Sequence, residues 1–145
     1  MGEKVESTDI IEKSKEILLH EVEDLDAIIL FGSYARGKQK TTSDIDIAIK
    51  PIEELNSLKM LDIKNKIEDA IGIDVHLINL NTINEDFKYE ILISGKTLYC
   101  KNEYEFEMYK LKMYSNYLLF SEDRKPIIDK IKNGGTLYGK WVSCI

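Results

Sequence analysis

The chain has 145 residues, of which 43% are hydrophobic and 32% charged, and its formal net charge is −6. This length allows one hydrophobic core rather than two, and the composition is typical of a folded globular domain. The acidic balance disfavours a nucleic-acid partner, and no apolar run reaches the roughly 20 residues of a membrane-spanning helix, so a cytoplasmic protein without a membrane partner is expected.

The N-terminal third predicts a helix followed by a buried strand. Residues 7–23 carry apolar side chains at helical spacing, and Asp26 is expected to separate this helix from the next element. Residues 27–31 form a continuous apolar run, which is typical of a strand buried on both faces. The predicted apolar stripe of the helix is Ile11, Leu18 and Val22.

A strict alternation follows at residues 44–50, after one predicted helical turn and a polar loop. Because successive side chains of a strand point to opposite faces, the isoleucines share one face and the carboxylates the other. The first face holds Ile45, Ile47 and Ile49, and the second holds Asp44, Asp46 and Ala48.

The rest of the pattern predicts an α/β fold: a small mixed sheet of about four strands with packed helices and a helical C-terminal segment. Residues 1–100 would form the core, and residues 101–145 a helical extension of the same domain. The predicted elements are helices at 53–71, 84–93, 103–120 and from 125 to about 133, and strands at 73–80 and 97–100. The stripe predicted for the helix at 53–71 is Met60, Ile63, Ile67, Ala70 and Ile71.

The chemistry concentrates where the first strand ends and the second begins. Gly32 and Ser33 leave the apolar run, and Asp44 and Asp46 follow ten residues later. Two carboxylates at i and i+2 on a strand have Cα atoms about 7 Å apart, so their oxygens can converge on a hard cation such as Mg²⁺. A glycine permits close backbone approach to a phosphate, and Ser33 adds a hydroxyl and an amide. Asp74 is the candidate third carboxylate, either as a metal ligand or as a general base.

These residues resemble a known motif. Gly32-Ser33, ten residues and then Asp44-Ile45-Asp46 are similar to the motif of the DNA polymerase β-type nucleotidyltransferase superfamily, and specifically of its minimal branch. The resemblance covers about residues 8–100. It implies that Gly32 and Ser33 hold a nucleoside triphosphate, ATP in the first hypothesis, and that Asp44, Asp46 and Asp74 bind Mg²⁺.

The resemblance also implies a biological setting. Many members of the minimal branch are antitoxins encoded beside HEPN-domain toxins, and members transfer AMP from ATP to a tyrosine of the toxin. The first hypothesis is therefore a Mg²⁺-dependent protein adenylyltransferase with a HEPN-type toxin as its partner, in a hetero-oligomer or as a homodimer. Two alternatives stay open: nucleotide transfer to a small hydroxylated molecule, as in aminoglycoside-modifying relatives, and a non-catalytic antitoxin that only binds its partner.

Three further features have two interpretations each. Arg36, beside the glycine-serine turn, could contact the triphosphate or pair with a carboxylate. His76 could approach the cleft, but the prediction leaves it outside the site as a structural histidine. The aromatic helix at 103–120 carries more large apolar side chains than one stripe can hold, so it either packs on the sheet or binds a partner protein.

Overall fold

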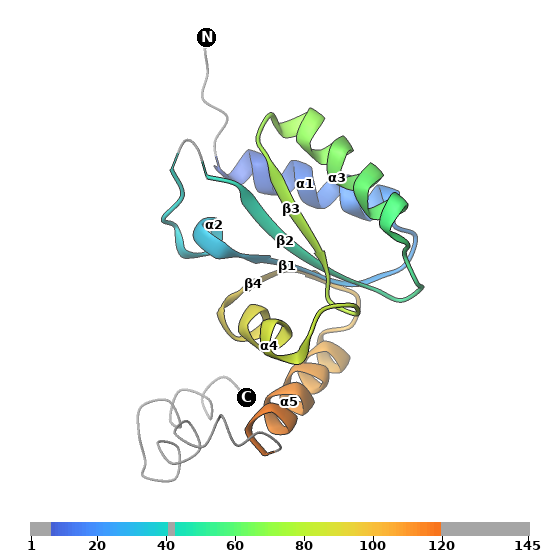
Figure 1. Cartoon of the computed structure of the whole chain (residues 1–145), viewed down its shortest axis with the longest axis vertical. Helices are drawn as coiled ribbons and strands as arrows, with labels where there is room; N and C mark the ends of the chain where they lie inside the picture. The colour runs from blue at the N-terminus through green and yellow to red at the C-terminus, as the bar shows by residue number, and fades with distance from the viewer. Residues whose placement is uncertain (1–6, 41–42, 120–145) are drawn as a thin grey trace. The chain divides into compact units, whose positions relative to one another are not determined.

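A mixed sheet with the strand order β3-β2-β1-β4 forms the centre of the structure, a computed structural model that describes residues 7–40 and 43–119 (Figure 1). β1 is antiparallel to both of its neighbours, and β2 is parallel to β3. This confirms the predicted four-stranded mixed sheet. The strands are β1 (Leu25–Phe31), β2 (Ile45–Pro51), β3 (Val75–Asn79) and β4 (Lys96–Cys100).

The helices lie close to their predicted positions, and asparagine caps mark the start of three of them. Asn56, Asn84 and Asn102 each accept a hydrogen bond from the backbone N–H three residues later. Because Asn56 is a cap, the second long helix begins at Ser57 rather than at the predicted residue 53. The helices are α1 (Ser7–Glu21), α2 (Gly32–Arg36), α3 (Ser57–Ile71), α4 (Glu85–Ser94) and α5 (Glu103–Leu119).

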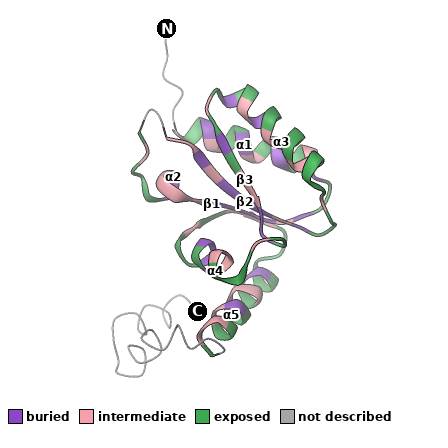
Figure 2. Ribbon diagram, in the orientation of Figure 1, coloured by how far each residue is buried: buried purple, intermediate pink, exposed green. Residues whose placement is uncertain are grey.

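α1 and α3 lie side by side over one face of the sheet, and the main core is between them and the strands (Figures 1 and 2). The three isoleucines of β2 are completely buried there, as the alternation predicts. The opposite face of β1 meets α4, where the rings of Phe31 and Phe87 pack edge to face with centroids 6.0 Å apart. The two faces of β2 therefore differ: the isoleucine face packs in the core, and the opposite face carries the Asp46 side chain.

Three details differ from the prediction. Asp26 lies inside β1 rather than before it, because its carboxylate pairs with Lys50 Nζ of β2 at 2.7 Å. On α1 the most buried apolar residue of the first turns is Ile10, whereas Ile11 is only half-buried. Ala70, expected on the apolar stripe of α3, is exposed. In each case the difference comes from a neighbouring element. Lys50 of β2 pairs with Asp26, and the elements packed against α1 and α3 determine which residues of these helices are buried.

The chain divides into two compact units between Lys101 and Asn102. The first contains the sheet and α1 to α4, and α5 belongs to the second. Within α5 the rings of Phe106 and Tyr109 stack at 6.1 Å, and Lys110 Nζ lies 5.2 Å from the Phe106 centroid. The helix expected from residue 125 lies outside the described residues, and the role of α5 as a packing or partner-binding helix stays a prediction. Among the described helices, none is both long and apolar enough to cross a membrane.

Candidate active site

The turn that leaves β1 brings the chain back as β2 beside it. α2 starts at Gly32, directly after β1, and ends at Arg36, and the C-cap residue Gly37 follows with a positive φ of 68°. The Lys38 N–H then donates to the Ser33 carbonyl oxygen at 2.9 Å. In the antiparallel register Phe31 pairs with Asp46. The glycine-serine turn and the second aspartate are thus brought to one end of the sheet.

Gly32 is in direct contact with this aspartate. Its φ is +73°, a conformation that side chains with a Cβ rarely adopt. A Cβ at Gly32 would also collide with Asp46 Oδ2 and lie 2.9 Å from Asp46 Cγ. The prediction explained this glycine by the approach of a phosphate. The structure adds a second reason, which is the space that the Asp46 carboxylate itself occupies.

Asp44 and Asp46 sit at the start of β2, on the side away from α1 and α3. Asp46 lies in the strand, while Asp44 directly precedes it. Their side chains are 37% and 21% exposed, respectively. Asp46 is therefore held in a buried strand and Asp44 directly beside it, and both carboxylates remain accessible to a ligand.

The side chain that adjoins both carboxylates is His76 of β3. The parallel register pairs Asp46 with His76. His76 Nδ1 lies 2.8 Å from Asp46 Oδ1, and Nε2 lies 3.2 Å from Asp44 Oδ2. The prediction left this histidine outside the site as a structural histidine, and the structure places its ring against both carboxylates. Only the strand register brings the two residues together, and a sequence pattern does not reveal which residues of two distant strands face each other.

Asp74 lies just before β3, and its side chain is exposed. Its carbonyl oxygen accepts a hydrogen bond from the Ile45 N–H at 3.0 Å, which holds its backbone beside the start of β2. Within residues 7–40 and 43–119, no hydrogen bond or ion pair joins its carboxylate to Asp44 or Asp46. Its role as the third carboxylate therefore stays a prediction.

Glu68 of α3 anchors the start of β3. Its Oε2 accepts hydrogen bonds from the Val75 N–H at 2.9 Å and from Lys64 Nζ at 3.0 Å. The backbone hydrogen bond of Val75, followed by that of Lys64, lowers the pKa of Glu68 below its ordinary value of 4.5. This carboxylate thereby fixes the backbone that carries Asp74 and His76.

The contribution of Glu68 to stability is expected to depend on pH. Because its folded pKa is lowered, the ionised carboxylate stabilises the fold above pH 4.5, and this stabilisation is lost as the pH falls through the folded pKa. Glu68→Gln should therefore lower the free energy of unfolding at neutral pH, and the difference from wild type should shrink in acid. Urea unfolding between pH 7 and pH 3 measures this. Glu12→Gln, at an exposed position of α1, is the control; an equal pH trend in both variants would contradict the assignment.

Positive side chains surround the loop after α2. Arg36, Lys38 and Lys40 are exposed, and the Lys40 N–H donates to Ser43 Oγ at 2.7 Å, so Ser43 closes the loop before Asp44. Among the residues that the structure describes, Arg36 takes part in no ion pair. Both interpretations of Arg36, contact with a triphosphate and pairing with a carboxylate, stay predictions.

The donor set of this site suits a cation that arrives with its own ligands. No group of three or more His, Cys, Asp or Glu side chains among the described residues is arranged to hold a metal ion. Asp44 and Asp46 nevertheless offer two hard carboxylates on one side of β2. Mg²⁺ commonly takes only one or two protein carboxylates and completes its shell with water and substrate phosphates. The pair thus fits a magnesium-nucleotide complex better than an isolated ion.

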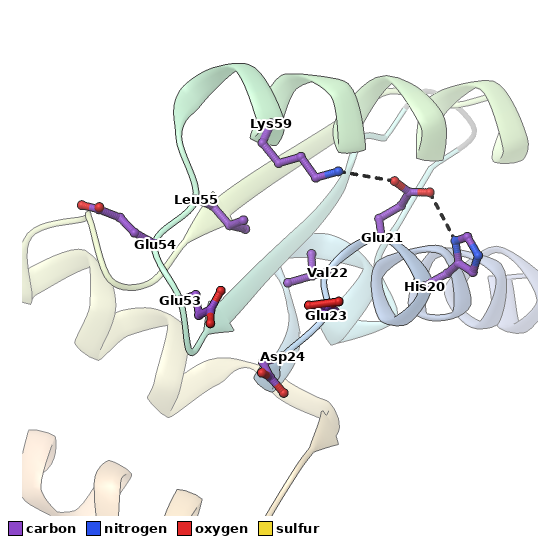
Figure 3. Close-up of a pocket in the computed structure, with 9 residues that line it drawn as sticks. All are labelled: His20, Glu21, Val22, Glu23, Asp24, Glu53, Glu54, Leu55 and Lys59. Atoms are coloured by element: carbon purple, nitrogen blue, oxygen red, sulfur yellow. Dashed lines mark hydrogen bonds and ion pairs between the residues drawn. The ribbon is translucent and has the colours of Figure 1, made fainter.

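A separate pocket of about 340 Å³ lies at the opposite end of β1 and β2 (Figure 3). Its only positively charged residues are His20, when protonated, and Lys59, and Glu21 pairs with both of them, at 3.3 Å and 3.7 Å. Hydrogen bonds from Lys66 and His20 lower the pKa of Glu21. An acidic pocket of this kind repels a triphosphate. Its lining is His20, Glu21, Val22, Glu23, Asp24, Glu53, Glu54, Leu55 and Lys59.

The chain is similar to known nucleotidyltransferases. The family model described as polymerase beta, nucleotidyltransferase matches residues 12–104. The protein adenylyltransferase MntA of Shewanella oneidensis is 30% identical over 115 residues, which cover 79% of this chain and 82% of that protein. MJ1217 of Methanocaldococcus jannaschii is 42% identical over 82 residues, covering 57% of this chain and 83% of the relative.

Two solved structures of toxin–antitoxin complexes contain chains with a similar fold. A chain in a crystal structure of a toxin–antitoxin with AMP-PNP superposes with a TM-score of 0.71 and 29% identity, over 83% of this chain and 97% of that one. A chain from the complex of tri-AMPylated Shewanella oneidensis HEPN toxin with MNT antitoxin superposes with a TM-score of 0.70 and 25% identity, over 88% and 99% of the two chains.

Proposed function

Because this chain belongs to the polymerase β nucleotidyltransferase family, we propose that it is a protein adenylyltransferase that transfers AMP from ATP to a tyrosine of a HEPN-domain toxin and so acts as an antitoxin. The observation that carries the proposal is the contact between the Gly32 turn and Asp46, with Asp44 beside it. The adenylyltransferase relative and the complexes described above support the choice of AMP and of a HEPN partner.

Each motif residue has a role in this proposal. The Ser33 hydroxyl and amide donate to a phosphate oxygen, and the Arg36 guanidinium binds the triphosphate from the exposed end of α2. Asp44 and Asp46 would hold Mg²⁺, with Asp74 as the third carboxylate. A bound Mg²⁺ would neutralise charge on the triphosphate and on the departing pyrophosphate.

The transfer itself is a displacement at the α-phosphorus. The acceptor oxygen forms a bond to this phosphorus while the bond to pyrophosphate breaks, and pyrophosphate leaves. The hydroxyl proton of the acceptor has to go to a nearby base, and Asp74 is the candidate because its backbone is held beside the start of β2.

The open site favours an acceptor on another protein. The carboxylates of Asp44 and Asp46 are partly exposed, so a tyrosine on a folded partner could approach them directly. We also propose a cytoplasmic location, where ATP is abundant. Assembly with the toxin in a hetero-oligomer, rather than as a homodimer alone, is part of the same proposal.

Labelled ATP tests this function. The purified chain is incubated with [α-³²P]ATP, Mg²⁺ and a candidate HEPN-domain protein, and the modified residue is located by mass spectrometry. Addition of AMP to a toxin tyrosine is expected, with no label when Asp44→Asn/Asp46→Asn is used. Label on a small hydroxylated molecule without any protein acceptor would instead support the first alternative. Full neutralisation of the toxin in cells by the double variant would support a binding antitoxin.

A further inference from the structure

His76 lies against both of the carboxylates that are proposed to hold a cation. Its imidazole lies 2.8 Å from Asp46 Oδ1 through Nδ1 and 3.2 Å from Asp44 Oδ2 through Nε2. An ionised carboxylate only accepts hydrogen bonds, so in the shorter contact the Nδ1–H group is the donor. One side chain thus contacts an oxygen of each aspartate.

Gly32 restricts the orientation of the Asp46 carboxylate. Its Oδ2 lies against Gly32, where even a Cβ would collide. Its Oδ1 is therefore the oxygen that faces away from the turn, and this is the oxygen that His76 contacts. A cation that binds Asp46 through Oδ1 therefore competes with His76 for this oxygen.

The His76 side chain is exposed enough to move away from the two carboxylates. Its side chain is 59% exposed, whereas Asp46 is 21% exposed, so the imidazole can rotate into solvent while the carboxylate stays in place. A cation that arrives with a nucleotide also brings phosphate oxygens that can bind Ser33 and Arg36, and these contacts offset the lost hydrogen bond, whereas a free aqueous cation brings only water. The competition is therefore strongest when no nucleotide is present.

We infer that His76 is a positioning residue that covers Asp44 and Asp46 in the nucleotide-free protein, so that a divalent cation binds these carboxylates well only together with the nucleotide. The inference rests on the proposed function for the assignment of the two aspartates as cation ligands. It goes beyond that function because it gives His76 a role in the order of binding. The imidazole is a competitor of the cation and not one of its ligands.

Mn²⁺ binding to the full chain without nucleotide tests this inference, with the free ion measured by electron paramagnetic resonance at one pH. His76→Ala should lower the Kd for Mn²⁺ by about three- to tenfold, the range expected for losing one ordinary hydrogen bond at a partly exposed site. With a non-hydrolysable ATP analogue present, both proteins should bind Mn²⁺ more tightly than without it, because the phosphates supply further ligands. His20→Ala is the matched control, since the chain has two histidines and His20 lies on α1 beside Glu21.

The direction of the change in the Kd for Mn²⁺ tests the inference. Weaker Mn²⁺ binding by His76→Ala would make the histidine a metal ligand and overturn the inference, and an unchanged Kd would also overturn it. Imidazole NMR gives a second readout: Mg²⁺ with the ATP analogue should shift the His76 resonances and not those of His20. The variant Asp44→Asn/Asp46→Asn separates the two proposals. If it binds Mn²⁺ like wild type, the assignment of the aspartates fails; if it loses binding while His76→Ala gains none, only the role of His76 fails.

Discussion

Asp46→Asn is expected to lower the rate of AMP transfer by about a hundred- to a thousandfold, because it removes a charged cation ligand from the reacting triphosphate. The asparagine has the same shape, so it fits against Gly32 without a new collision. The free energy of unfolding should change by no more than about 1 kcal/mol at this partly exposed position. Transfer rates with the toxin partner and urea unfolding of the purified variant measure the two effects.

Asp26→Asn is the matched control for this substitution. Asp26 is also a partly exposed strand carboxylate with a basic partner, Lys50 Nζ at 2.7 Å, but it lies at the beginning of β1, far along the strand from Gly32. Losing this ion pair should cost about 0.2–1 kcal/mol of stability and leave transfer unchanged. Equal activity of the Asp46 and Asp26 variants would refute the assignment of Asp46 to the site.

Gly32→Ala is expected to reduce transfer about a hundredfold, since a displacement of about 1 Å in a reacting group has effects of that size. The new Cβ would collide with the Asp46 carboxylate and displace it from its present position. Alanine at a φ of +73° adds about 1 kcal/mol of backbone strain. Activity, Mn²⁺ affinity and stability of the same preparation measure these consequences together.

Gly37→Ala separates the backbone strain from the collision. Gly37 has a similar φ of +68°, but a Cβ there would meet no atom within 4 Å. It should therefore lose about as much stability as Gly32→Ala through strain, while retaining transfer and Mn²⁺ binding. If both variants lost activity equally, the contact between Gly32 and Asp46 would not explain the role of this glycine.

Some features of the site follow from local periodicity. Asp44 and Asp46 share a face because strand side chains alternate, and the burial of Ile45, Ile47 and Ile49 confirms which face belongs to the core. The turn at Gly32 was predicted equally well, since a glycine-serine pair ends an apolar run there. These properties involve residues close together in the chain, so the pattern of one short segment contains them.

Other features depend on which segments meet. Asp26 was expected to lie between the first helix and the first strand, but it belongs to β1, where Lys50 of the next strand neutralises it. Ala70 fits the helical stripe and is nevertheless exposed, because the neighbours of α3 cover only the face that includes Ile63 and Ile67. Neither outcome could be obtained from the period of a single element.

The sequence by itself determined the family, the mixed sheet and the pair of aspartates at a glycine-serine turn. Only the tertiary structure decided that Gly32 touches the Asp46 carboxylate and that His76 adjoins both aspartates. The physical reason is the register between β2 and β3, which pairs residues 30 positions apart and is determined by the packing of buried side chains across the whole sheet. A shift of one residue in that register would have turned His76 to the opposite face.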